Sequence, residues 1–350
     1  MMIISRELFD QQRLPRFGKT NPERMTFAFW EWMIRGDDDP RVDASRGLEK
    51  IGLRLRNETL KSSYGPYRAR DLFNIPLNPE EGPIWTFDRM GQTRTRLPEG
   101  RLICIGGEHE DFYDPDSFIY NDVVVFTPQD GIEIYAYPRE VFPPTDFHSA
   151  TVADGRIVII GGLGNENERC PGHTPVYSLD LSSYSISKIL TSGELPGWIS
   201  KHEARHEHTG IITIRAGQVV QECGSEQRIS RNFEDFALDL RSCVWQRLTD
   251  RNWHEFSIRQ EKGALFVLER DPKPETLIPR SIPHVILPSE RNADVRFLVA
   301  EIPVSLTLDV TQIEIVVEGN LPESLLARLL EEIRANTEAE VGCCCTLNQR

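Results

Sequence analysis

No stretch of this chain approaches the roughly 20 consecutive apolar residues of a membrane-spanning helix. Residues 1–7 lack a basic segment followed by a long apolar core, so we expect no secretory signal. The seven cysteines are odd in number and include no C-x-x-C pair, which argues against a disulfide framework and a structural zinc site. We therefore expect a cytoplasmic protein without membrane contact.

Positive charge is also scarce. Lys and Arg number 40 against 54 Asp and Glu, which leaves a net charge of -14. A negative surface field repels phosphate backbones, so nucleic acid is not an expected partner, and a basic protein or a cationic small ligand is a better one. No Rossmann fingerprint, P-loop or Ser-His-Asp order stands out, and no cofactor is expected.

Four short apolar runs recur along the middle of the chain. They begin at Leu102, Ile157, Ile211 and Ala264, which are 55, 54 and 53 residues apart. Their β-branched composition predicts buried strands, and the first two end in Gly-Gly. A strand-like segment and a turn come before the runs, and two further strand-like segments follow the first three. Four antiparallel strands in roughly 50 residues form one blade of a β-propeller.

The order of these segments resembles the kelch motif. It is clearest in the second unit, with His148-Ser149-Ala150-Thr151, the strand ending at Gly161-Gly162, a variable loop and a Leu-Asp-Leu strand. Residues 82–89 and 142–148 also resemble a group of uncharacterised bacterial kelch-like proteins. The resemblance implies a mainly β fold, a kelch-like β-propeller. Members of the family usually have six or seven blades, and about four are recognisable here.

The flanks do not repeat. Apolar residues at Phe27, Phe29, Trp30, Met33 and Ile34 have helical spacing, and a second apolar set spans 48–55. Two alternating strands near 295–317 precede an amphipathic helix that starts at 321–323. We therefore predict an N-terminal helical extension over 1–80, propeller repeats over 81–285, a ββα element over 290–342 and a flexible tail over 343–350.

One pattern points to metal chemistry. His202, Glu203 and His206 match the H-E-x-x-H motif of zinc metalloproteases, which requires both histidines on one face of a helix. The repeat instead predicts a strand here, and residues four apart on a strand lie about 13 Å apart. These three residues are therefore weak metal candidates, and no metal site is expected.

Polar loops between the second and third strands of the first two units contain the predicted binding residues. Such loops lie on one face of a propeller, where binding groups gather. The alternating carboxylates of the first loop could also bind a divalent cation, although a solvated acidic loop is more common. The candidate residues for partner binding are Glu108, His109, Glu110, Asp111, Tyr113, Asp114, Asp116, Asn165, Glu166 and Glu168.

Three functions are compatible with these features. The favoured one is a protein-binding scaffold without catalytic activity, regulatory or of the immunity type, in which an acidic protein binds a basic toxin. The second is an enzyme acting on a sugar or other small molecule at a propeller mouth, through residues such as Arg89, His109 and His148. The third is the zinc metalloprotease, which the repeat register disfavours.

Overall fold

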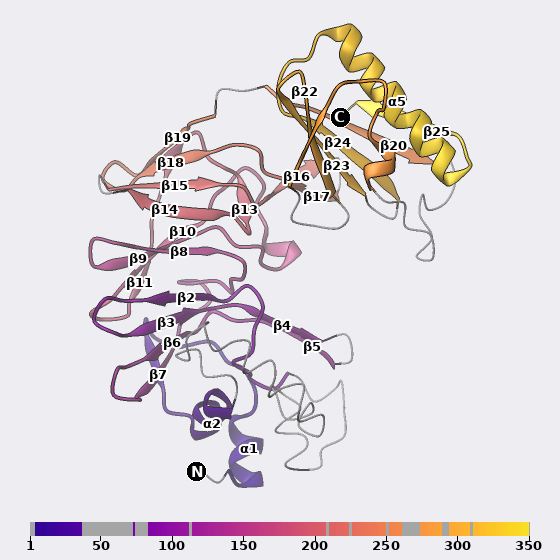
Figure 1. The fold of residues 1–350 in the computed structure, drawn as a ribbon. Helices are drawn as coiled ribbons and strands as arrows, with labels where there is room; N and C mark the ends of the chain where they lie inside the picture. The colour runs from indigo at the N-terminus through magenta and orange to yellow at the C-terminus, as the bar shows by residue number, and fades with distance from the viewer. Residues whose placement is uncertain are drawn as a thin grey trace. The chain divides into compact units, whose positions relative to one another are not determined.

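The computed structural model describes residues 4–36, 73, 83–111, 114–207, 210–223, 226–249, 252–260, 274–288, 294–308 and 311–349. The chain divides into two compact units, Met1–Thr249 and Asp250–Arg350, and each is described by itself. Most elements in both units are β-strands, and the described part contains three α-helices (Figure 1). The mainly β class is therefore confirmed. None of the sheets that these residues form closes into a barrel.

The first unit contains three successive antiparallel sheets of the same connectivity (Figure 1). In each sheet the chain runs from one edge strand to the other through two tight turns and one longer insertion. The first sheet holds β2 Thr93–Arg96, β3 Leu102–Ile105, β6 Val123–Phe126 and β7 Ile132–Ala136, with β1 Glu23–Met25 beside β7. The second holds β8 Ser149–Ala153, β9 Arg156–Ile160, β10 Val176–Asp180 and β11 Ile186–Lys188. The third holds β14 Glu203–Glu207, β15 Ile211–Arg215, β18 Phe236–Asp239 and β19 Val244–Arg247, with the short β12 Ser192–Gly193 parallel to β19.

Burial on both faces explains the unbroken apolar runs of the first two sheets. On β9, Ile157 and Ile159 pack against the first sheet, whereas Val158 and Ile160 pack against the third. Side chains alternate across a strand, so a strand covered on both faces needs apolar residues at every position. On β15 only Ile212 and Ile214 are buried, and the alternating residues are half-buried or exposed. The runs predicted at 102, 157 and 211 are confirmed as strands, whereas the run at 264 lies outside the described residues.

The N-terminal segment covers the other face of the first sheet. Helix α1 Arg6–Gln12 begins at Ser5, whose hydroxyl accepts a hydrogen bond from the Leu8 N–H at 3.1 Å. Helix α2 Ala28–Gly36 confirms the helix predicted from the apolar spacing, while the second predicted helix at 48–55 lies outside the described residues. Trp30 of α2 stacks on Trp85 with ring centroids 4.7 Å apart, in one cluster with alternate residues of β3.

Equivalent backbone positions join the three sheets. The Phe147 N–H donates to the Gly91 carbonyl and the Lys201 N–H donates to the Phe147 carbonyl, both at 2.8 Å. All three residues have positive φ and lie two residues before the first strand of their sheets. Strand β2 contacts β8, and β8 contacts β14. The three sheets therefore share one orientation, and corresponding loops leave them at the same end.

The Gly-Gly pairs that end the second strands allow close approach of the next segment. Gly161 has a φ of +69°, and a Cβ there would lie 2.2 Å from the Ile199 carbonyl oxygen. We expect Gly161→Ala to lower the free energy of unfolding by about 2–4 kcal/mol through strain and overlap. Gly155→Ala is the matched control, because it has a φ of +75° but nothing within 4 Å, and should cost about 1–2 kcal/mol. Equal losses for both in urea denaturation would contradict the packing argument.

The second unit is one antiparallel sheet covered by a helix. The sheet order is β21-β22-β23-β24-β20-β25, and Leu329, Leu330 and Ile333 of α5 pack on it as the amphipathic pattern predicted. No helix in the described ranges is long and apolar enough to cross a membrane. The elements are β20 His254–Gln260, the 3-10 turn η5 Pro274–Leu277, β21 Val285–Leu287, β22 Asp294–Val299, β23 Ile302–Leu308, β24 Gln312–Val317, α5 Glu323–Val341 and β25 Cys345–Gln349.

Two boundaries differ from those that the sequence predicts. The units divide between 249 and 250 rather than near 285, because β20 pairs with β24 and β25 of the second unit. The segment expected to be a flexible tail contains β25, in which Cys345 and Leu347 face the core. Backbone pairing with β20 and burial of these side chains order the segment.

Candidate functional site

Insertions at one end of the first unit are the candidate binding face. Each joins the second and third strands of its sheet, opposite the two tight turns, and all three leave from the same end because the sheets are oriented alike. In Figure 1 the hairpins β4–β5 and β16–β17 extend to the same side of the sheets. We name these segments insertion 1 (residues 108–119), insertion 2 (residues 163–175) and insertion 3 (residues 218–231), and together the insertion face.

Insertion 1 is a β-hairpin rather than the irregular loop that its polarity suggested. It consists of β4 Glu108–Asp111 and β5 Asp114–Ile119, with an irregular register between His109 and Asp111. The imidazole Nδ1 of His109 lies 3.2 Å from the Asp88 carbonyl oxygen. The predicted residues Glu108, His109, Glu110, Asp111, Asp114 and Asp116 lie on these two strands, and Tyr113 lies outside the described residues.

Insertion 2 carries a single 3-10 turn, η4 Glu166–Glu168. The Asn165 amide donates to the Glu168 carboxylate at 3.0 Å, and Arg139 pairs with the same carboxylate. Burial raises the pKa of Glu168, but the hydrogen bonds from Asn165 and Arg139 outweigh it and leave the pKa below its ordinary value. Glu166 is exposed. Of the predicted residues in this insertion, Glu166 is therefore the one open to a partner, whereas Asn165 and Glu168 shape the turn.

Insertion 3 was not predicted as a site. It is a second hairpin, β16 Gln218–Cys223 and β17 Glu226–Arg231, and β16 also pairs with β13 Trp198–Ser200. The Gln227 amide contacts the Arg169 carbonyl of insertion 2 at 3.5 Å. A signal was available, because its position follows those of insertions 1 and 2 at the same spacing of 55 residues. Insertions 2 and 3 thus contact each other.

The H-E-x-x-H residues lie in an extended segment, as the repeat predicted. Glu203 and His206 belong to β14, where Glu203 pairs with Arg215 at 2.9 Å and His206 lies opposite Ile212 of β15. His202 precedes the strand and is buried. The helical arrangement that zinc proteases use is therefore not formed. In the described part of the chain no group of three or more His, Cys, Asp or Glu is placed to hold a metal ion.

His148 and His202 form equivalent contacts between neighbouring sheets. His148 Nε2 lies 2.8 Å from the Thr93 hydroxyl, and His202 Nε2 lies 2.8 Å from the Ser149 hydroxyl. Both side chains are buried, which disfavours the charged imidazolium. Burial lowers the pKa of His148 to about 3, with a smaller contribution from His202, and burial lowers the pKa of His202 to about 4. The two histidines are neutral structural links.

Asp146 is a buried carboxylate that sequence reasoning missed. It is 0% exposed, its Oδ1 accepts the Gly164 N–H at 2.6 Å, and its Oδ2 has no hydrogen-bond partner among the described residues. Burial raises its pKa above the ordinary value, although the Gly164 hydrogen bond and the charges of Arg169 and Lys201 oppose the shift. Asp146 anchors the start of insertion 2 from the segment that leads into the second sheet.

Two of the three residues considered for an enzyme funnel are buried. The Arg89 side chain is 0% exposed, and its guanidinium is paired with Asp122 and donates to the Thr86 and Gly106 carbonyls. His148 is enclosed between sheets, whereas His109 lies on the β4–β5 hairpin. Arg89 and His148 are therefore unavailable to a ligand.

Comparisons with known proteins assign no family. No protein-family model and no curated protein sequence matches the chain. Among solved structures it is similar to YjhT, at 12% identity and a TM-score of 0.31, over 69% of this chain and 68% of that chain. It is also similar to MPT-4, a mannose phosphorylase from Leishmania mexicana in complex with phosphate ion, at 11% identity and a TM-score of 0.29, over 67% of this chain and 68% of that chain. Likeness at this level supports neither a family nor an activity.

Proposed function

We propose that the first unit is a kelch-like propeller segment that binds another protein through the insertion face. Three features support the propeller assignment: the repeated four-strand sheets, their stacking through shared apolar clusters, and the hydrogen bonds between equivalent positions. A blade buries its faces only against neighbouring blades, which fits β9 packed on both sides.

The observation that carries the binding role is the common direction of the three insertions. They extend beyond the stacked sheets at one end, whereas the opposite end has tight turns such as 97–101 and 153–156. Rigid sheets that hold variable polar segments at one end are the usual arrangement of a binding surface.

Charge favours a basic partner. Insertion 1 contains five carboxylates between Glu108 and Asp116, and the chain carries a net charge of -14. A negative surface accelerates encounter with a positively charged protein and discriminates against acidic ones. The structure has free thiols at Cys104, Cys170, Cys243, Cys343, Cys344 and Cys345, which agrees with a reducing compartment such as the cytoplasm as the place of binding.

Charge removal at the two ends of the first unit tests this role. The full chain and the variant Glu166→Gln/Glu222→Gln, with one exposed carboxylate removed from each of insertions 2 and 3, are used to capture partners from a lysate of the source cells. The matched control Asp130→Asn/Asp154→Asn removes two exposed carboxylates from tight turns at the other end. We expect a basic partner to be captured by the wild type and the control, and at least about tenfold less by the insertion variant. Equal capture by both variants would place the binding surface elsewhere.

A further inference from the structure

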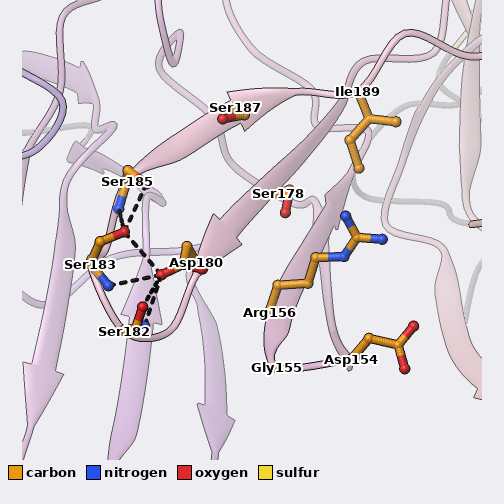
Figure 2. A pocket seen from close by; sticks show the side chains of 10 residues that line it. All are labelled: Asp154, Gly155, Arg156, Ser178, Asp180, Ser182, Ser183, Ser185, Ser187 and Ile189. Carbon is orange, nitrogen blue, oxygen red and sulfur yellow. Dashed lines mark hydrogen bonds between the residues drawn. The ribbon is translucent and has the colours of Figure 1, made fainter.

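A polar cavity of about 530 Å³ lies on the second sheet, toward its tight turns. Figure 2 shows the Arg156 guanidinium and the hydroxyls of several serines around it. The cavity is of the size that small-molecule sites usually have. Its lining comes from one face of β9, β10 and β11 and from their turns: Asp154, Gly155, Arg156, Ser178, Asp180, Ser182, Ser183, Ser185, Ser187 and Ile189.

Arg156 is the unpaired cation of this cavity. It is half-buried, its Nε is enclosed, and no hydrogen bond or ion pair to its guanidinium exists in the part of the chain that the structure describes. A guanidinium that has lost water at its Nε without gaining an acceptor is destabilised. An oxyanion in the cavity would give the guanidinium, which lines it, a counter-charge and an acceptor for its other N–H groups.

The preceding repeat shows how this arginine is satisfied elsewhere. Arg101 lies 55 residues earlier, at the equivalent position, and donates to the Tyr184 hydroxyl at 2.6 Å and the Leu181 carbonyl at 2.9 Å of the next sheet. It also pairs with Glu99 at 2.6 Å. Arg101 therefore has a complete set of acceptors within the protein.

Around Arg156, the side chains at the positions equivalent to Glu99 and Tyr184 are shorter. Asp154 replaces Glu99, and Cys243 replaces Tyr184, at the same φ of 57° and with the same backbone hydrogen bond to the aspartate four residues earlier. Among the described residues, no hydrogen bond joins Arg156 to Asp154 or to Cys243. The second repeat thus retains the arginine without the side-chain partners that Arg101 has.

The carboxylate opposite Arg156 is used in a turn. Asp180 lies across from Arg156 in the register of β9 and β10. Its Oδ1 accepts the N–H and hydroxyl of Ser182 at 3.0 and 2.6 Å, and those of Ser183 at 2.8 and 2.9 Å. These bonds, that of the Ser182 hydroxyl foremost, lower the pKa of Asp180. The Asp180 side chain therefore points toward Ser182 and Ser183 of its own turn, as Figure 2 shows.

Two hydroxyls remain as donors beside the guanidinium. Ser178 and Ser187 are directly paired on β10 and β11, and Ser178 also faces Val158, two residues beyond Arg156 on β9. Directly paired and alternate residues share one face of a sheet, so both hydroxyls lie on the side of Arg156. We propose that this cavity binds a small oxyanion, a phosphate or carboxylate group, between the Arg156 guanidinium and the hydroxyls of Ser178 and Ser187.

Titration of the full chain with inorganic phosphate and, separately, with acetate tests this site. Calorimetry at constant ionic strength should show saturable binding of at least one anion, and the anion that binds distinguishes a phosphate from a carboxylate ligand. Arg156→Gln should weaken binding about tenfold or more, because a charge-assisted pair is lost. Asp154→Asn should strengthen it, because a competing negative charge leaves the cavity.

Two further variants keep the test decisive if Arg156→Gln folds poorly. Cys243→Tyr restores the partner that Arg101 has, at a φ that Tyr184 already adopts, and should weaken binding by occupying the guanidinium. Arg101→Gln removes an arginine that is already paired and should leave anion affinity unchanged. Absence of saturable binding to the wild type, or equal affinity in the wild type and Arg156→Gln, would overturn the proposal.

Discussion

Replacing Asp122 with Asn is expected to lower the free energy of unfolding of the first unit by about 3–5 kcal/mol, because it leaves the Arg89 guanidinium buried without a counter-charge. The two side chains are 0% and 5% exposed, and Asp122 also accepts the Trp85 indole N–H at 2.9 Å. The Arg89 side chain is not exposed and its guanidinium carbon lies 3.3 Å from the Tyr120 ring centroid, so solvent does not reach the cation that Asp122 neutralises. Urea denaturation followed by fluorescence measures the loss.

An exposed pair serves as the control for this prediction. Glu203 and Arg215 are 62% and 51% exposed, and Glu203→Gln removes the same charge with an expected change within about 0.5 kcal/mol. The double variant Arg89→Met/Asp122→Asn leaves no unpaired buried charge. Its loss of unfolding free energy should therefore be smaller than the sum of the losses of the two single variants. Two results would show that the buried pair does not stabilise this core. One is a loss of unfolding free energy in the double variant equal to the sum of the two single losses. The other is a loss from Asp122→Asn no larger than that from Glu203→Gln.

Acidification is expected to destabilise the first unit through His148 and His202. Their folded pKa values, about 3 and about 4, lie below the ordinary value of 6.5. Between these folded values and pH 6.5 the unfolded chain therefore binds more protons than the folded chain. The stability that the neutral histidines contribute is present above pH 6.5 and is lost as the pH falls toward the folded values. Each histidine changes stability by about 1.4 kcal/mol per pH unit, so two units of acidification cost about 5 kcal/mol.

Variants separate this effect from that of the carboxylates. His148→Gln and His202→Gln should each flatten the dependence of the urea midpoint on pH between about 6.5 and 4.5, whatever they cost at neutral pH. Asp146 acts in the opposite direction, because a raised folded pKa favours the folded state on acidification, so Asp146→Asn should steepen the dependence. An unchanged slope in both histidine variants would contradict the assignment.

The strands of the three stacked sheets were predictable because a few consecutive residues are enough to identify each of them. Runs such as residues 157–160 are apolar at every position only when both faces of a strand are covered, and their recurrence located the same element three times. Helix α2 was predictable for a similar reason, since the fully buried Phe29, Trp30 and Met33 follow the helical period.

The unit boundary was not predictable because it depends on long-range pairing. Strand β20 follows the third sheet directly in sequence, yet its hydrogen-bonding partners are β24 and β25, about 50 to 90 residues later. Counting repeats assigned this region to a fourth blade. Pairing with β20 also orders Cys345–Gln349, whose sequence alone suggested a frayed end.

The candidate sites likewise include features that could be predicted from the sequence and features that could not. The carboxylates of insertion 1 were visible as a polar interruption between strands, whereas insertion 3 contains Val219, Val220 and Ile229 and gave no such signal. Arg156 could not be identified as unpaired from sequence, because its state depends on Cys243 and Asp180, which are 87 and 24 residues away. Comparison of Arg101 with Arg156 became informative only when the partners of Arg101 were known.

Hydrogen–deuterium exchange of the full chain, with and without the captured partner, is the most direct test of the insertion face as a binding surface. We predict that the partner slows exchange in insertions 1, 2 and 3, at residues 108–119, 163–175 and 218–231, and leaves the tight turns at 97–101 and 153–156 unchanged. Protection confined to those turns, or to the second unit at 250–350, would contradict the account.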